Sequence, residues 1–370
     1  MKKIKILSLF VMLTTLVGCQ ETPSDTTSES EVVEESVTTP SVSESVESDD
    51  TVYTTFVDLE DVTIEVGEKY SLKTALNGYK GVTIISKNIK VASYGTSSSS
   101  IIGKDIGTTY LVLSYNGEHQ KLKVNVVERG SLATSFKFDH FRLEGKKIAA
   151  FGDSVTADAT IGSSGKTYPR IISERFNMEF SKNYAIGGTT ATYMYVGSNI
   201  YKENKNNKTA IDGCRVVYNA FANDELYDLD YAFIAYGHND QYFQPPITVD
   251  GDTEYCVNNT FATCNSYKGS YRYMINVLRE ANPNVRIILL NCTYSEYDKA
   301  LPSPYGNKYS YTDYRNATKE IALEMNCRYI DPWDYMKDYY DYGSKYMYYS
   351  DSVHISAKGH QLLANYIVNN

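Results

Sequence analysis

From Lys146 to the C-terminus, short apolar runs alternate with segments of helix length. This pattern is typical of strand–helix units that pair into a parallel sheet. About 225 residues of it are enough for one domain with a substantial core. The expected strands are Lys147–Phe151, Phe180–Ile186, Tyr231–Tyr236, Val285–Asn291 and Arg328–Ile330, and the expected helices are Tyr168–Asn177, Tyr271–Ala281, Thr312–Asn326 and Ala357–Val368. The sequence therefore predicts an α/β domain over residues 145–370, with no regular pattern between Gly188 and Leu229.

The first expected strand runs into Phe151-Gly152-Asp153-Ser154-Val155. This order puts the Ser154 hydroxyl on a tight turn at the carboxyl end of a strand, where open α/β sheets form their ligand crevices. Serine is a weak nucleophile unless a base takes its proton, so the motif predicts catalysis only together with a base and with donors for an oxyanion. The alternative role for Ser154 is that of a helix N-cap.

The base must come from the five histidines if the enzyme works near neutral pH, because imidazole titrates near pH 6.5. Three of them are expected away from the strand ends, in the N-terminal strands, in a linker and on the surface of the last helix: His119, His140 and His360. His354 has Asp351 three residues earlier, so that carboxylate can hold one ring nitrogen while the other faces Ser154. The alternative for His354 is an ordinary histidine of a surface loop.

Three further sequence blocks follow the Ser154 block: Asn183-Tyr184-Ala185-Ile186-Gly187-Gly188, Gly237-His238-Asn239-Asp240 and Asp351-Ser352-Val353-His354. Ser, Gly, Asn and His in this chain order resemble the SGNH (GDSL-type) hydrolase family, over residues 145–370. The resemblance implies a flavodoxin-like, three-layer α/β/α fold and ester hydrolysis through an acyl-enzyme, without a cofactor. Small departures from the family pattern are Val155-Thr156 in place of Leu-Ser, and Ile355 where proline is common.

The resemblance also assigns roles to single residues. Ser154 is the nucleophile, His354 the base and Asp351 the residue that orients it. The implied oxyanion donors are the backbone N–H groups of Ser154 and Gly188 and the side-chain amide of Asn239. The family's spacing favours Gly188 over Gly187, and a glycine lets the oxyanion approach closely. The supporting residues are Asp153 and Asp240, which brace the loops, and His238, at the variable position of its block and a candidate substrate contact. A second pair, Asn223-Asp224, follows neither a strand nor a glycine and is excluded.

Residues 1–19 have the features of a bacterial lipoprotein signal peptide. A lysine-rich start precedes the apolar stretch Ile6–Val17, which is too short to span a membrane. Leu16-Val17-Gly18-Cys19 resembles a lipobox, which implies cleavage before Cys19 and a lipid on its sulfur. The alternative is an ordinary secretory signal. We therefore expect an exported protein that is lipid-anchored at the bacterial cell surface.

Residues 20–51 consist almost entirely of Ser, Thr, Glu, Asp, Val and Pro, without Lys or Arg. Such a segment buries too little apolar surface to offset its ordering entropy, so it predicts a disordered tether of about 30 Å average span. Its acids account for most of the formal net charge of −9. The remaining chain is close to neutral and has no long basic run, which argues against nucleic acid as a partner and leaves the lipid anchor as the expected membrane contact.

Residues 52–128 alternate like short antiparallel strands separated by turn residues, among them Asn77-Gly78 and Asn116-Gly117. Asn-Gly between alternating strands is a hairpin signal, and the pattern predicts an all-β sandwich. The segments 66–70 and 90–94 resemble bacterial immunoglobulin-like (Big) domains, which implies a spacer or an adhesive surface; a spacer is the preferred interpretation. Residues 129–144 are expected to be a linker.

Five cysteines remain after lipidation of Cys19. Cys256 and Cys264 flank a short polar segment and could close a disulfide loop in an oxidising compartment. Cys292 and Cys327 are expected to be buried thiols. No spacing of cysteine and histidine resembles a zinc site, and the sequence shows no glycine-rich phosphate loop, so we expect no metal.

The 35 tyrosines hint at the substrate, because aromatic rings with a polar tip suit stacking on sugars, although half-buried packing explains most tyrosines. The preferred hypothesis is an O-acetylesterase acting on a cell-wall or extracellular polysaccharide. One alternative is a lipase or thioesterase with the same catalytic residues, which needs a continuous apolar groove. The other is a non-catalytic surface adhesin or glycan-binding lipoprotein. The sequence does not determine the acyl group, the sugar or the oligomeric state.

Overall fold

A five-stranded parallel sheet organises the C-terminal part of the computed structural model, which describes residues 51–192, 212–249, 265–297, 306–341 and 345–370. The strand order is β12-β11-β10-β8-β9, and every pair is parallel. The strands are β8 (Lys147–Gly152), β9 (Glu179–Asn183), β10 (Tyr231–Ala235), β11 (Arg286–Leu290) and β12 (Arg328–Ile330). All five expected strands are therefore present, and their shared direction brings their carboxyl ends to one edge.

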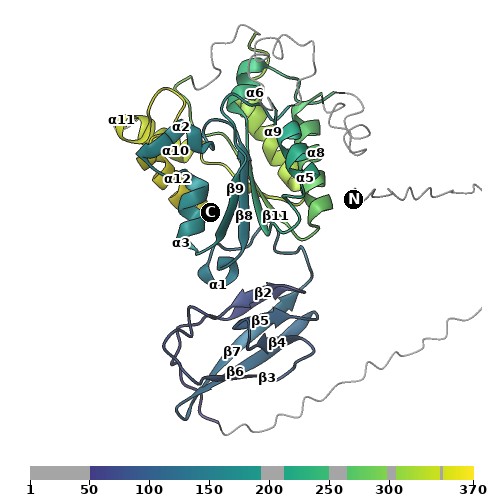
Figure 1. Cartoon of the computed structure of the whole chain (residues 1–370), viewed down its shortest axis with the longest axis vertical. Coiled ribbons are helices and arrows are strands. Elements are labelled where there is room, and N and C mark those ends of the chain that lie inside the picture. The colour runs from purple at the N-terminus through teal and green to yellow at the C-terminus, as the bar shows by residue number, and fades with distance from the viewer. Residues whose placement is uncertain (1–50, 193–211, 250–264, 298–305, 342–344) are drawn as a thin grey trace, which may run out of the picture. The chain divides into compact units, whose positions relative to one another are not determined.

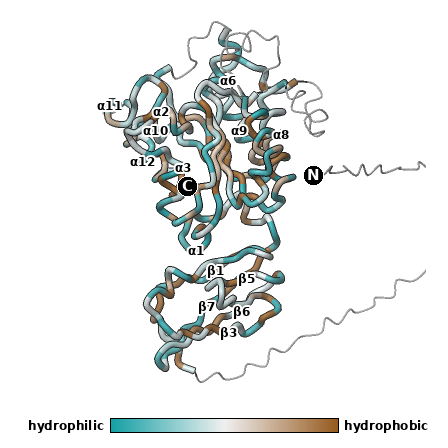
Figure 2. Tube along the Cα trace, viewed as in Figure 1, coloured by the Kyte–Doolittle hydropathy of each residue, from teal (hydrophilic) through white to brown (hydrophobic). Residues whose placement is uncertain are grey.

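Helices cover both faces of this sheet, because side chains of successive strand residues point to opposite sides. On β8, Ala149 and Phe151 pack into one core cluster, whereas Ile148 and Ala150 pack into the other. The first cluster contains α5 (Gly213–Ala222), α8 (Tyr267–Ala281) and α9 (Tyr311–Glu324), and the second contains α3 (Tyr168–Arg175), α10 (Trp333–Tyr339) and α12 (Ala357–Asn369). Figure 1 shows the sheet between these two groups of helices, and Figure 2 shows hydrophobic residues concentrated along its strands. The predicted three-layer α/β/α fold is confirmed.

The sequence missed several helices. α5 lies in the stretch for which no regular structure was expected. It begins after Asp212, whose side chain accepts from the Arg215 N–H, and it buries Cys214, Val216, Val217 and Ala220. This helix was missed by the sequence analysis because polar residues surround its short apolar pattern. The short helix α6 (His238–Phe243) was also missed, because it starts directly behind a strand without a side-chain cap.

Seven strands in two sheets form the N-terminal part of the described chain. The sheets have the orders β1-β7-β6-β3 and β2-β5-β4. The strands are β1 (Val62–Glu65), β2 (Lys69–Ser71), β3 (Thr83–Ser86), β4 (Ala92–Gly95), β5 (Ser100–Gly103), β6 (Gly107–Tyr115) and β7 (Glu118–Val127). Their inward side chains share one apolar core. The resemblance of this part to immunoglobulin-like domains stays a prediction.

Two expectations for these strands need correction. Asn116 and Gly117, with φ of 50° and 83°, close the β6–β7 hairpin as expected, because this two-residue turn requires positive φ. Asn77-Gly78 does not close a hairpin, since the flanking strands β2 and β3 belong to different sheets. The sheets are also not purely antiparallel, because β1 pairs with β7 in parallel.

The segment expected to be a linker is folded. Phe136, Phe138 and Leu143 are buried among the side chains of α3, β10 and α12, and residues 140–143 form the short helix α1 (His140–Leu143). The Arg328 guanidinium donates to the Phe136 carbonyl and lies 4.9 Å from the centre of its ring. Residues 129–144 pack against the α/β domain because the apolar side chains of Phe136, Phe138 and Leu143 are buried in its core.

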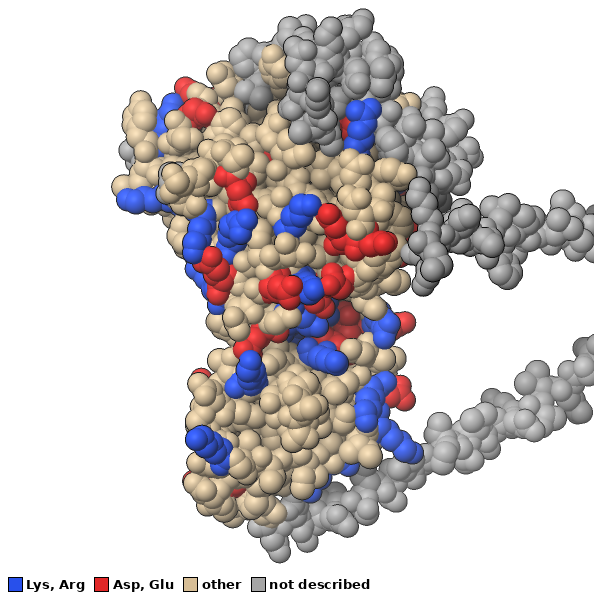
Figure 3. All heavy atoms as spheres, in the orientation of Figure 1, with Lys and Arg blue, Asp and Glu red and all other residues tan. Residues whose placement is uncertain are grey.

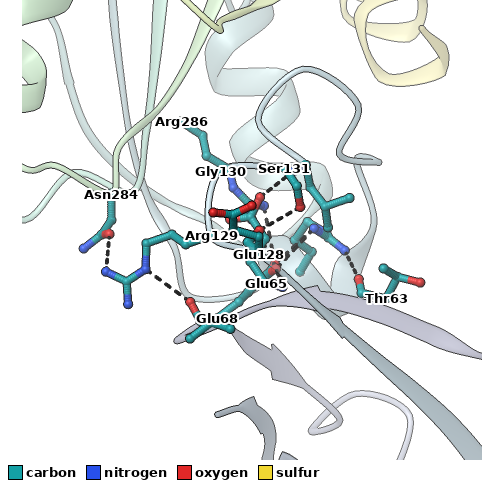
Figure 4. A network of polar contacts seen from close by, with 12 residues as sticks. Thr63, Glu65, Glu68, Glu128, Arg129, Gly130, Ser131, Asn284 and Arg286 are labelled. Atoms are coloured by element: carbon teal, nitrogen blue, oxygen red, sulfur yellow. Dashed lines mark hydrogen bonds and ion pairs between the residues drawn. The ribbon is translucent and has the colours of Figure 1, made fainter. Parts of the chain in front are cut away.

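A buried network of charges joins the β1–β2 turn to the amino-terminal edge of the parallel sheet (Figure 4). Arg286, at the start of β11, contacts Glu65 at 3.2 Å and Glu68 at 3.1 Å. Arg142 contacts Glu68 at 3.1 Å and donates to the Thr63 carbonyl at 2.9 Å. The charged side chains are at most 11% exposed. Figure 3 shows basic and acidic side chains intermixed on this face of the molecule.

We expect Arg286→Met to lower the free energy of unfolding of residues 51–370 by about 3–5 kcal/mol, because it leaves Glu65 and Glu68 buried with one cation fewer. The control is Lys166→Met. It removes an exposed pair with Glu174 and should cost no more than about 1 kcal/mol. Urea denaturation measures both. A loss at Arg286 no larger than at Lys166 would contradict this assessment of the network.

Candidate active site

A hydrogen-bonded chain of three side chains lies at the carboxyl edge of the parallel sheet. The Ser154 Oγ, two residues beyond β8, lies 2.8 Å from the His354 Nε2. The His354 Nδ1 lies 2.7 Å from the Asp351 Oδ2. Ser154 and His354 are 200 residues apart in the sequence, so the fold brings them together. Nucleophile, base and orienting carboxylate in this order are the arrangement that activates a serine for attack.

A tight loop fixes Asp351 relative to His354. The Asp351 Oδ1 accepts from the backbone N–H groups of Val353 and His354, each at 2.7 Å, which leaves Oδ2 for the imidazole. The Ser350 N–H donates to the His354 carbonyl at 2.9 Å. Partial burial acts to raise the pKa of Asp351, but the hydrogen bonds from His354 and Val353 outweigh it and hold that pKa below its usual value. The carboxylate therefore stays charged near neutral pH.

A glycine turn lies close to Ser154, and an amide is bonded to that turn. Gly188 has a φ of 80°, a conformation that favours glycine, and a Cβ on Gly187 would lie 3.7 Å from the Ser154 Cβ. The Asn239 side-chain N–H donates to the Thr189 carbonyl at 2.8 Å, which ties this amide to the same turn. Gly188 and Asn239, the predicted oxyanion donors, are therefore held close together by the hydrogen bond to Thr189, next to Ser154.

Buried carboxyls hold the backbone of these loops. The Asp240 side chain is fully buried and accepts from the Ala191 N–H at 2.8 Å, from the Thr192 N–H at 3.1 Å and from the Thr192 hydroxyl at 2.8 Å. Asp153 accepts from the Val155 N–H at 3.0 Å, beyond Ser154. Burial raises the pKa of Asp240 to about 6 and that of Asp153 to about 7, although these N–H donors act in the opposite direction.

His238 does not face a substrate. It is 3% exposed, and its ring nitrogens lie 3.3 Å from the Tyr311 hydroxyl and 3.3 Å from the Thr293 hydroxyl. Burial, and secondarily the nearby His354, lowers the pKa of His238 to about 3, so the ring is neutral. The predicted substrate contact is therefore corrected: the side chain packs below the site, with protein partners at both nitrogens.

His360 is buried, so the prediction of a surface position for it was wrong. It is 1% exposed, its Nδ1 lies 3.3 Å from the Tyr168 backbone N–H, and burial lowers its pKa to about 4. Gly359, Leu362 and Leu363 mark the same buried face of α12. The helical spacing of these residues could have placed His360 on the buried face of α12.

The contacts that hold the loop carrying His354 were also missed by the sequence analysis. The Ser352 carbonyl accepts from the Glu296 N–H at 3.0 Å and from the Ser295 hydroxyl at 3.3 Å. The Ser352 hydroxyl donates to the Glu296 carboxylate at 2.6 Å, and Lys345 lies 3.1 Å from the same oxygen. Hydrogen bonds from Ser352 and Lys345 lower the pKa of Glu296 to about 2. An acidic residue in a loop gives no sequence signal of such a role.

Three of the cysteines lie in the described part of the chain, and all three are buried. Cys292 and Cys327 are buried free thiols, as expected, and Cys214 is a third. Cys256 and Cys264 lie outside the described residues. Among the described residues, no three His, Cys, Asp or Glu side chains form a group that could hold a metal ion. In the same part of the chain, no helix has the length and apolar character needed to cross a membrane.

The comparison with protein families identifies this arrangement. Residues 150–362, more than half of the chain, match the GDSL-like Lipase/Acylhydrolase family. The chain therefore belongs to this family of esterases and acylhydrolases, and it is an enzyme of the GDSL (SGNH) type. A search of curated protein sequences gives no match.

Solved structures are similar to part of this chain at low sequence identity. A protein from Lactobacillus plantarum has 17% identity and a TM-score of 0.41, covering 61% of this chain and 96% of its own. A protein from Bacteroides ovatus, described as a GDSL-like lipase, has 16% identity and a TM-score of 0.41, with coverage of 60% and 96%. A catalytic mutant of Axe2, an acetylxylan esterase from Geobacillus stearothermophilus, has 18% identity and a TM-score of 0.38, with coverage of 61% and 94%.

The raised pKa of the buried Asp240 carboxyl predicts how the stability of the fold depends on pH. Its pKa of about 6 lies above the value of 3.8 expected for an unfolded chain, so the folded state binds the proton more tightly. The resulting stability is fully present below pH 3.8 and is lost as the pH rises through 6.

We therefore expect the unfolding free energy of the wild type, relative to Asp240→Asn, to fall by about 2 kcal/mol between pH 4 and pH 7. Urea denaturation of both proteins across this range measures the difference, and the comparison cancels the contribution of the other titrating groups. A difference that stays constant or grows with pH would contradict the raised pKa of Asp240.

Proposed function

We propose that this protein is an exported serine esterase that removes O-acetyl groups from a cell-wall or extracellular polysaccharide. The observation that carries the proposal is the hydrogen-bonded series Ser154, His354 and Asp351 beside Gly188 and Asn239. Family membership supports ester hydrolysis as the class of reaction. The signal peptide, the lipobox cysteine Cys19 and the acidic tether at residues 20–51 support a location at the bacterial cell surface, where such polysaccharides occur.

The proposed reaction has two halves. His354 Nε2 takes the proton of Ser154 as its Oγ attacks the ester carbonyl, while Asp351 keeps the imidazole oriented and stabilises its charged form. The backbone N–H groups of Ser154 and Gly188 and the Asn239 amide hold the tetrahedral oxyanion. His354 then returns the proton to the departing alcohol, which leaves an acyl-Ser154 ester. In the second half, His354 deprotonates a water molecule that hydrolyses this ester and restores the free serine.

The openness of the site supports a large substrate. Side-chain exposure is 56% for Asp351 and 31% for His354, so the reacting groups lie near the surface. An ester group on a polymer can reach such a site while the rest of the polymer stays in solvent. This exposure, together with the tether, supports an acylated polysaccharide in preference to a lipid.

Ser154→Ala should lower the turnover of p-nitrophenyl acetate by residues 51–370 at least about 10⁴-fold, because the nucleophile is lost. The wild type should prefer acetate over butyrate and octanoate. Ser98→Ala, which changes an exposed serine outside the α/β domain, is the matched control and should keep wild-type turnover. If the folded wild type hydrolyses none of these esters, the enzymatic proposal fails. A preference for octanoate would instead favour a lipase.

Asn239→Ala should lower kcat by about 10²–10³-fold and change KM little, since the amide donates to an oxyanion that exists only near the transition state. Steady-state kinetics on p-nitrophenyl acetate measures both constants, and circular dichroism verifies that the variant is folded. A rise in KM with kcat intact would instead assign Asn239 to ground-state binding.

A further inference from the structure

A groove of about 430 Å³ lies beside the loop that carries Asp351 and His354. It is lined by Thr160 and Ile161 of α2 (Asp158–Ile161) and by Tyr346 and Met347 of α11 (Lys345–Tyr348). Ser350 and Lys358 are among the remaining lining residues. Its volume falls within the range of about 300–1,000 Å³ that is usual for pockets that bind small molecules. Figure 1 shows α2, α11 and α12 on the same side of the sheet.

The groove and the catalytic site are built from the same segments of the chain. Its Ser350 donates to the His354 carbonyl through its backbone N–H at 2.9 Å and through its hydroxyl at 3.2 Å. Its Ile355 directly follows His354 and forms a β-bridge with Tyr349. The lining helix α2 begins shortly after Ser154 in the sequence. The groove therefore lies between the chain segments that deliver the nucleophile and the base.

The chemistry of ester hydrolysis decides which half of the substrate this groove can receive. His354 must return a proton to the leaving alcohol, so the alcohol oxygen has to approach its Nε2. The carbonyl oxygen is instead expected at the oxyanion donors Gly188 and Asn239. The alcohol part of the ester thus leaves the site on the side of the His354 loop, which is where the groove lies.

The lining of the groove suits a sugar in preference to a long acyl chain. Tyr346 is 90% exposed and Met347 is 48% exposed, so a flat ring and a flexible apolar side chain face solvent at its edge. The polar residues Thr160, Ser350 and Lys358 line the groove together with its apolar residues. Sugars combine an apolar C–H face with polar edges, and aromatic residues with a polar tip match this combination.

We propose that this groove binds the carbohydrate part of the substrate and that Tyr346 stacks against one of its sugar rings. The proposal rests on the proposed esterase function, for which it supplies the binding site of the polysaccharide chain. It makes Tyr346 a residue that determines specificity and takes no part in the chemical step.

Binding is tested first in the Ser154→Ala background, in which turnover does not interfere. Isothermal titration with O-acetylated xylo-oligosaccharides should show binding to Ser154→Ala, and adding Tyr346→Ala should weaken it about tenfold through the lost stacking contact. Tyr346→Phe keeps the ring and should retain the affinity. Tyr227→Ala removes a tyrosine that is 45% exposed outside the groove and should have no effect. Undetectable binding, or equal affinity with and without Tyr346, would overturn the proposal.

Kinetics separates this proposal from the esterase proposal. For an active wild type, Tyr346→Ala should lower kcat/KM on the acetylated oligosaccharides about tenfold relative to kcat/KM on p-nitrophenyl acetate, whose alcohol is too small to need the groove. An equal loss on p-nitrophenyl octanoate would assign the groove to the acyl chain and overturn the carbohydrate proposal. If the wild type hydrolyses no ester but still binds the oligosaccharides through Tyr346, the esterase proposal fails and the groove remains a sugar-binding site.

Discussion

The parallel pairing of β8 with β10 is the constraint on which the candidate site depends. Gly152, at the end of β8, is in register with Ala235, at the end of β10. The chain after each strand therefore emerges at the same edge, with Ser154 on the turn after β8 and Asn239 in the first turn of α6 after β10. A Cβ on Gly152 would lie 2.6 Å from the Ala235 carbonyl oxygen, so this approach requires glycine.

The site is held in place by groups that are costly to bury. Asp153 and Asp240 are withdrawn from water, and their raised pKa values express that cost. The hydrogen bonds that they accept order the backbone around Ser154 and the glycine turn. The open face has the opposite character, because Asp351 and His354 remain partly in solvent. A rigid, buried support below an exposed catalytic surface suits a substrate too large to be enclosed.

The sequence predicted the parts of the fold that follow from local pattern. Apolar runs located all five parallel strands, and the end of the first of them pointed to Ser154. His354 was predicted by choosing among the five histidines and Asp351 by its spacing from His354, whereas the role of Asn239 came from the family resemblance. It failed where long-range packing decides the outcome. The burial of Phe136 in the presumed linker and of His360 in α12 depends on surfaces supplied by distant segments. The contacts of Glu296 with Ser352 likewise join two loops whose proximity only the assembled sheet creates.

The central claim is that Ser154 is a nucleophile activated by His354, and a fluorophosphonate probe tests it most directly. Mass spectrometry of the labelled protein should show one adduct on the peptide that contains Ser154. The adduct should be absent in Ser154→Ala, and labelling should be strongly slowed in His354→Ala, because the serine then lacks its base. Labelling at another residue, or labelling at Ser154 whose rate does not depend on His354, would contradict the account.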